Sequence, residues 1–216
     1  MTRQTNSRPI NEQAVRDLLD RYACPVPWHE VRTRFMGNIA TPALSAAPLQ
    51  TLKNLWGGEF PPVDSIDDLN ALIDALINTF WNALTVHQKH SKPFRLLRMP
   101  STQTLGDLGA LALMRQQELE GFVEGLFNGE EQINLPERAH QAVDHLAKLR
   151  AMMAGIHQMV LREIKAESQT TLDTTFKHIR ELTRIMEIEI NEAILSCTRA
   201  RRHLLDSQPV FDPTVH

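Results

Sequence analysis

The chain has 216 residues, 42% of them apolar, with a formal net charge of −3 and a pI near 6.3. This apolar content supports a sizeable core and argues against a chain disordered throughout. The near-neutral charge argues against a general nucleic-acid coat protein, which needs concentrated lysine and arginine. No apolar run approaches the roughly 20 residues of a membrane span, and the polar N-terminus lacks the apolar segment of a secretory signal. We therefore expect a cytoplasmic protein without membrane contact.

The chain contains two cysteines, Cys24 and Cys197, which lie far apart in the sequence. A disulfide framework needs more cysteines than this, so reduced thiols are the simpler expectation. We interpret both as small buried hydrophobic residues.

Short helices are predicted in the first quarter of the chain. Residues 1–10 are polar and without periodicity, which predicts a flexible tail. A first helix follows Asn11 as its N-cap, and Cys24-Pro25-Val26-Pro27 ends it because closely spaced prolines do not continue a helix. A second helix is expected from about Trp28 to Asn38, and a third has Pro48 in its first turn.

The clearest helical pattern runs from Ser65 to about Leu84. Ser65 is a good N-cap, and Asp67 and Asp68 lie at the positive end of the helix dipole. Apolar side chains recur there with helical period, namely Leu69, Leu72, Ile73, Leu76, Ile77, Phe80, Trp81 and Leu84. We interpret residues 91–104, which follow, as a connector.

A helix from about Thr104 to Asn128 contains four glycines, each of which weakens a helix by about 1 kcal/mol relative to alanine. Beyond it, Asn134 as N-cap and Pro136 in the first turn begin two long amphipathic helices that separate near Ser168–Thr171. The predicted fold is all-α, a multi-helix bundle with a long C-terminal antiparallel helical hairpin. Residues 11–130 form one helical domain, residues 131–205 form the hairpin packed on it, and residues 206–216 form a tail.

Several short motifs resemble the YecA/YgfB-like family of bacterial proteins. They are Phe35-Met36-Gly37, Pro42, Pro48, Trp56-Gly57-Gly58-Glu59, Asn82 and Gly121-Phe122-Val123-Glu124-Gly125. The resemblance covers about residues 30–130 and implies an all-helical fold in a largely uncharacterised family. Many longer relatives end in a cysteine-rich zinc module with a Cys-x-Cys start. This chain has only Cys197 in its C-terminal half, so the family's zinc-dependent partner binding is not expected here.

Two glycine motifs are candidate interaction sites. In Trp56-Gly57-Gly58-Glu59 the glycines allow positive φ and close approach, and Glu59 could present a carboxylate. A tight turn with Trp56 in the core is the simpler interpretation. Gly121 and Gly125 have the small-xxx-small spacing of a close helix crossing. That crossing could bind a partner, although a crossing within the chain is favoured.

Two further groups carry other chemistry. Glu137 and His140 form one Glu-x-x-His, the unit of di-iron carboxylate bundles, but such bundles need a second unit and two more glutamates. No second copy is found, so no cofactor is assigned. Arg199, Arg201 and Arg202, together with Arg180 and Arg184 upstream, could form a basic stripe for nucleic acid. Cationic residues that compensate a helix C-terminus are the favoured alternative.

No catalytic constellation and no phosphate-loop pattern is present in the sequence. The leading hypothesis is a non-enzymatic module that contacts an unknown protein partner or forms a homodimer through the C-terminal hairpin. A metal-binding helical bundle is the alternative from a different class. A regulator that touches nucleic acid through its C-terminal arginines is the weaker third hypothesis, since nucleic acid is not an expected partner at this net charge.

Overall fold

The computed structural model describes residues 12–43, 46–99, 103–162 and 169–207, and within these ranges every regular element is helical. The predicted all-α fold is therefore confirmed. The N-terminal tail and most of the C-terminal tail lie outside the described residues. The elements are α1 (Glu12–Arg21), α2 (Trp28–Ala40), α3 (Pro48–Asn54), α4 (Ile66–Ile73), the π-helix η1 (Asp74–Trp81), α5 (Asn82–Leu84), the 3₁₀-helix η2 (Thr85–Gln88), α6 (Leu105–Phe127), α7 (Glu137–Leu161) and α8 (Gln169–Asp206).

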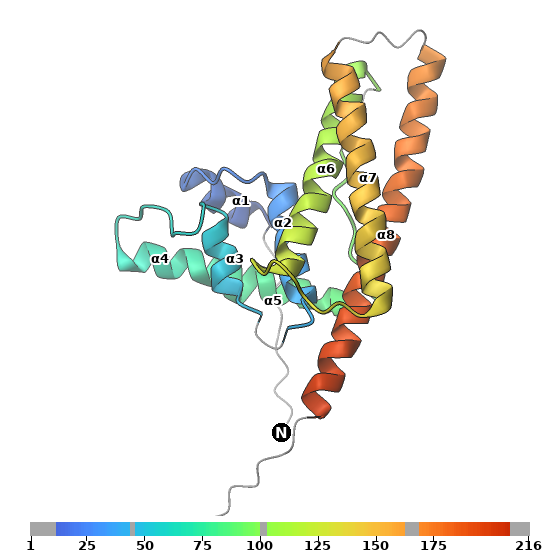
Figure 1. Cartoon of the computed structure of the whole chain (residues 1–216). Helices are drawn as coiled ribbons and strands as arrows, with labels where there is room; N and C mark the ends of the chain where they lie inside the picture. Colours follow the sequence, from blue (N-terminus) through green and yellow to red (C-terminus); the bar gives the residue numbers. More distant parts are fainter. Residues whose placement is uncertain (1–11, 44–45, 100–102, 163–168, 208–216) are drawn as a thin grey trace, which may run out of the picture.

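The helices form two groups that meet along α2 and α6 (Figure 1). The short helices α1, α3, α4 and α5 gather around α2, while α6, α7 and α8 form an elongated column. The predicted long hairpin is present as α7 and α8, which run antiparallel and pack on each other and on α6 within the chain. None of the described helices is long and apolar enough to span a bilayer.

Helix α7 begins later than the sequence predicts. Its first residue is Glu137, and Pro136 rather than Asn134 takes the N-cap position with φ −56° and ψ 147°. The expectation for Asn134 is therefore wrong, because this extended ψ at Pro136 separates Asn134 from the first helical turn. The cap of α6 follows the expected chemistry: Thr104 and Asp107 form a capping box of two reciprocal hydrogen bonds.

The long helical pattern after Ser65 is not one α-helix. Ser65 caps α4 as predicted, but residues 74–81 widen into the π-helix η1. The fully buried side chains Leu72, Leu76, Phe80 and Leu84 are spaced by four residues. On an α-helix of 3.6 residues per turn this spacing drifts by about 40° per step. Because the i→i+5 bonds of a π-helix turn the chain less per residue, η1 keeps these side chains on one buried face.

Helices α2 and α6 cross at very short range. A Cβ on Gly121 would lie 2.7 Å from Glu30 Cγ, and a Cβ on Gly125 would overlap the Arg34 carbonyl of α2. Gly37 of α2 meets the Phe122 carbonyl of α6 in the same way. Gly121 and Gly125 are therefore occupied by a contact within the chain, and their buried surfaces are not open to a partner.

Alanine substitutions separate this packing role from helix propensity. Gly125→Ala should lower the free energy of unfolding by about 1–3 kcal/mol, because the added methyl group meets backbone that cannot yield without moving α2. Gly155 of α7 is exposed and has nothing within 4 Å of its Cβ position, so Gly155→Ala should stabilise by up to about 1 kcal/mol. Urea unfolding of both variants measures the difference, and equal effects would contradict the close crossing.

Candidate functional site

The structure places the Trp56-Gly57-Gly58-Glu59 segment in a turn. Gly57 and Gly58 have φ of 81° and 109°, a backbone conformation that favours glycine. The Trp56 indole donates a hydrogen bond of 2.9 Å to the carbonyl of Tyr22 at the end of α1. Glu59 is exposed. The segment thus connects α3 to α1, and its glycines serve backbone geometry.

Glu137 and His140 do not meet a second pair of ligands. Glu137 accepts a hydrogen bond of 2.8 Å from Gln141, and His140 Nδ1 lies 3.5 Å from Asp144 Oδ2, all at the exposed surface of α7. Among the described residues no group of three or more His, Cys, Asp or Glu side chains is placed to hold a metal ion. The metal-binding alternative therefore has no converging ligand set in this part of the chain.

The C-terminal arginines act separately from one another. Arg201 donates a hydrogen bond of 3.2 Å to the carbonyl of Thr41, the C-cap of α2, and burial lowers the pKa of its guanidinium. Arg199 contacts the carbonyl of Leu195 in its own helix, and Arg202 is exposed. Arg201 thus fastens the end of α8 to α2, which leaves Arg199 and Arg202 on the surface.

An extended segment, residues 93–99, lies between α6 and α8, and we call it the strap. Side chains from the helices satisfy its backbone. The Asn191 amide donates to the carbonyl of Phe94 at 3.0 Å and accepts from its N–H at 2.8 Å. Glu187 accepts from the N–H of Leu96 at 3.1 Å. Helix α8 therefore holds the strap through side chains that replace a neighbouring strand.

A buried ion pair on α6 holds the strap from the other side. Glu118 accepts from the N–H of Leu97 at 2.9 Å, and Arg115 donates to the carbonyl of the same residue at 2.6 Å. The two side chains pair with each other, and Arg115 also donates to Thr183 Oγ1 of α8 at 3.2 Å. Glu118 is fully buried, which raises its pKa, and the charge of Arg115 opposes that rise. One ion pair thus connects α6, the strap and α8.

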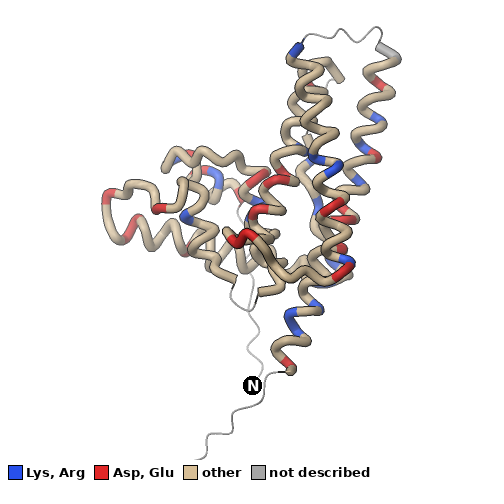
Figure 2. The backbone as a smooth tube through the Cα atoms, in the orientation of Figure 1, with Lys and Arg blue, Asp and Glu red and all other residues tan. Residues whose placement is uncertain are grey.

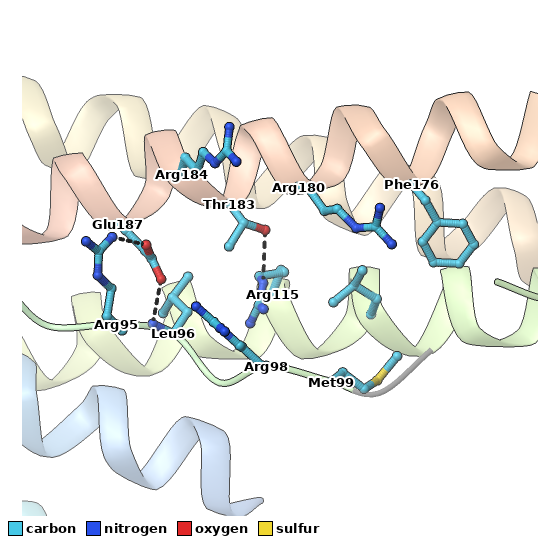
Figure 3. A pocket seen from close by; sticks show the side chains of 11 residues that line it. Arg95, Leu96, Arg98, Met99, Arg115, Phe176, Arg180, Thr183, Arg184 and Glu187 are labelled. Atoms are coloured by element: carbon cyan, nitrogen blue, oxygen red, sulfur yellow. Dashed lines mark hydrogen bonds and ion pairs between the residues drawn. The ribbon is translucent and has the colours of Figure 1, made fainter. Parts of the chain in front are cut away.

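The strap, α6 and α8 enclose a groove of about 580 Å³ that we call the arginine groove (Figure 3). Its apolar surface comes from Leu96, Leu111, Met99 and Phe176. Its polar lining comprises five arginines, one threonine and one glutamate: Arg95, Arg98, Arg115, Arg180, Arg184, Thr183 and Glu187. The groove therefore combines a strongly basic rim with an apolar floor.

Charge in this groove is only partly compensated. Three of its arginines are paired with carboxylates, namely Arg95 with Glu187, Arg115 with Glu118 and Arg184 with Glu181. Arg98 on the strap and Arg180 on α8 are exposed, and neither has an ion pair or hydrogen bond within the described part of the chain. Both side chains extend into the space between the strap and α8, whereas Arg184 points away from it (Figure 3). Two unpaired guanidinium groups thus flank one apolar floor.

This arrangement is suited to recognition of an anion. A guanidinium presents a planar fork of donors that matches a carboxylate or phosphate, and charge-assisted hydrogen bonds are stronger than neutral ones. The guanidinium groups of Arg98 and Arg180 come from different elements, so a ligand with two acidic groups can contact both. The buried Arg115 behind them keeps the floor fixed.

The sequence interpretation missed the strap and the groove. The sequence predicts only a connector for residues 91–104, and it places Arg180 and Arg184 either in a basic stripe or, as favoured, among cationic residues that compensate a helix C-terminus. One signal was available: Arg115 is a single charge directly after the apolar run Leu108–Met114. A charged residue directly after an apolar run either lies on the solvent-exposed face of the helix or is buried with a partner of opposite charge.

Comparison with protein-family models, with curated proteins and with solved structures found no match to this chain. The resemblance to the YecA/YgfB-like family therefore stays a prediction. Assignment of function rests on the geometry of the groove and the charges around it.

Removal of Glu118 tests the role of the buried pair. Glu118→Ala leaves Arg115 buried without its carboxylate and frees the N–H of Leu97, so the free energy of unfolding should fall by roughly 3–5 kcal/mol. The control is Glu120→Ala, which removes a surface ion pair with Arg150 of α7 and should change stability by less than about 1 kcal/mol. Urea unfolding measures both variants, and hydrogen exchange at Leu97 should accelerate only in Glu118→Ala. An unchanged exchange rate would contradict the proposed clamp.

Acidification should weaken the contact beneath the strap. The ring of His87 lies edge-on to Phe94 with centroids 5.3 Å apart, and its Nδ1 is 2.9 Å from the carbonyl of Lys92. Burial lowers the pKa of His87 from the ordinary 6.5. Because the unfolded chain then binds the proton more readily, the free energy of unfolding should fall as pH drops through 6.5 and below.

Urea unfolding at about pH 7 and about pH 5 measures this loss, since histidine is the side chain that titrates between them. His87→Gln should reduce the loss, whereas His140→Gln, at an exposed position on α7, should leave it unchanged. An identical loss in all three proteins would assign the pH dependence to other groups.

Proposed function

We propose that this chain is a non-enzymatic, cytoplasmic interaction module and that the arginine groove binds an acidic segment of a partner protein. One observation carries the proposal: Arg98 and Arg180 line the same groove without a carboxylate partner among the described residues. Aspartate and glutamate side chains supply the matching acceptors. An acidic partner segment would complete the charge balance of the groove.

The openness of the site favours a polypeptide segment over an enclosed small molecule. The side chain of Arg95 is 67% exposed although it lines the groove. Small-molecule sites usually bury about 70–90% of the ligand surface, which a groove with such exposed walls does not favour. The apolar floor, which includes Leu96 and Phe176, would take an apolar side chain located between acidic residues.

The charge distribution disfavours nucleic acid as the ligand. Lysine and arginine are interspersed with aspartate and glutamate along α7 and α8 (Figure 2), and on α6 Arg115 is accompanied by acidic residues, namely Asp107, Glu118, Glu120 and Glu124. Glu187 lies in the groove itself, and Glu181 accompanies Arg184 at its rim. Binding to a phosphate backbone needs a continuous basic footprint, and this protein has a net charge of −3. A segment with a few acidic groups fits two free guanidinium groups better.

A fluorescent acidic peptide with one central leucine or phenylalanine tests the proposal by fluorescence anisotropy. The wild-type protein should bind it, and Arg98→Gln/Arg180→Gln should weaken binding at least about tenfold, because each charge-assisted hydrogen bond contributes about 1.5–3 kcal/mol. The matched control is Lys148→Gln/Arg202→Gln, which removes the same charge from exposed positions of α7 and α8 outside the groove and the C-terminal contact of Arg201. Its affinity should stay within about twofold of wild type.

Three results would contradict the proposal. The first is equal weakening in both double variants, which would indicate attraction to net charge alone. The second is equal binding of a peptide with glutamine in place of every acidic residue. The third is binding of a single-stranded oligonucleotide that is tighter than binding of the peptide and that only Arg98→Gln/Arg180→Gln abolishes. This result would favour the nucleic-acid alternative.

A further inference from the structure

Helix α8 carries a second surface, whose side chains do not line the arginine groove. Six of its side chains recur with alternating spacings of four and three residues, and we call them the seam: Glu181, Ile185, Ile188, Glu192, Leu195 and Arg199. Ile185 and Ile188 are 44% and 57% exposed, and Leu195 is half-buried. This spacing is the heptad pattern through which two helices pair, so the exposed apolar residues are placed as a coiled-coil contact would place them.

A hollow beside the seam adds shape to this pattern. It has a volume of about 210 Å³. Its lining combines apolar side chains with polar and charged ones: Pro93, Ile188 and Leu195 together with Lys89, His90, Arg95, Glu187, Asn191 and Glu192. The side chain of Ile185 projects from the same helix, about one turn before Ile188 and seven residues before Glu192. One copy therefore presents the exposed apolar side chain of Ile185 next to a hollow whose wall is partly apolar and partly charged.

The two ends of the seam also carry opposite charges. Its first residue is Glu181 and its last is Arg199, which lie about 27 Å apart at 1.5 Å rise per residue. A second α8 laid antiparallel with its centre at Ile190 places Glu181 opposite Arg199 of the second copy, twice by symmetry. The same register places Ile185 opposite Leu195 of the second copy.

We propose that two copies of this chain pair antiparallel through the seam of α8. The contact is isologous, as in most symmetric dimers: Glu181 meets Arg199, Ile185 meets Leu195, and Ile188 meets Glu192 of the other copy. A parallel arrangement would instead place Glu181 against Glu181 and Arg199 against Arg199. Glu192, in the middle of the seam, has its carboxylate 3.5 Å from Arg138 of α7, so its charge is compensated within the copy.

This pairing does not depend on the binding function of the groove. The free guanidinium groups of the groove belong to Arg98 and Arg180, and neither is a seam residue. Loss of peptide binding would leave the dimer standing, and loss of the dimer would leave the groove intact. The two proposals can therefore fail separately.

Charge reversal followed by sedimentation velocity over a concentration series tests the pairing. The wild-type protein should show a concentration-dependent dimer. Glu181→Arg alone and Arg199→Glu alone should each raise the dissociation constant at least about tenfold, because each creates two like-charge contacts. Glu181→Arg/Arg199→Glu should restore the dimer, since every reversed residue meets a reversed partner. An equimolar mixture of the two single variants should also form a dimer.

Substitutions on neighbouring surfaces complete the test. Ile185→Gln should weaken the dimer, whereas Met159→Gln, which changes an apolar side chain on α7 that is 54% exposed, should leave it unchanged. Circular dichroism should show the same helical signal for all variants because the changed residues are exposed or half-buried. A wild-type protein that is monomeric at every concentration would overturn the proposal. So would a dimer that both single reversals leave intact, or a double variant that stays monomeric while the wild type dimerises.

Discussion

The buried pair of Arg115 and Glu118 is the contact on which the groove depends. It takes up the N–H and the carbonyl of Leu97 together, so the strap cannot slide along α6 without leaving a buried charge or a backbone group without a partner. Asn191 of α8 likewise hydrogen-bonds to both the N–H and the carbonyl of Phe94. Buried ion pairs add little to stability when compared with a well-packed apolar core, but they strongly disfavour any arrangement that separates them. Here the arrangement they favour is the one in which Arg98 on the strap faces the same groove as Arg180.

Helix α8 serves three surfaces at once, and its sequence reflects this division. Phe176, Ile179, Met186 and Ile190 are buried in the column, while Thr183 and Glu187 belong to the groove. The seam residues occupy the remaining face. Since a helix places residues three and four apart on one face, a helix of 38 residues can devote separate stripes to core, ligand and partner. A dimer through the seam would present two grooves on one particle, which raises the apparent affinity for a partner with two acidic segments.

The sequence predicts most of the helices because their signals are local. Helical period, the cap at Ser65 and the proline before Trp28 are all read from neighbouring residues, and these elements begin close to their predicted positions. The π-helix could not be predicted from the sequence because a spacing of four residues fits both an α-helix and a wider one. The strap and the groove could not be predicted for a different reason. Their hydrogen bonds join α6, residues 93–99 and α8, so the partners of Leu97 lie 18 to 21 positions away and those of Phe94 lie 97 away. No local sequence pattern shows which distant side chains will hydrogen-bond to the backbone of an extended segment.

In the proposed function, the strap and α8 together form one binding surface for acidic segments. A nuclear magnetic resonance titration of the full chain with the acidic peptide tests it most directly, with backbone amides as the probe. Shifts should be confined to residues 95–99 and 180–187, with the amide of Leu97 still protected because the buried pair holds it. Shifts centred on Arg199 and Arg202, or shifts spread evenly over every basic residue, would show that the peptide binds elsewhere.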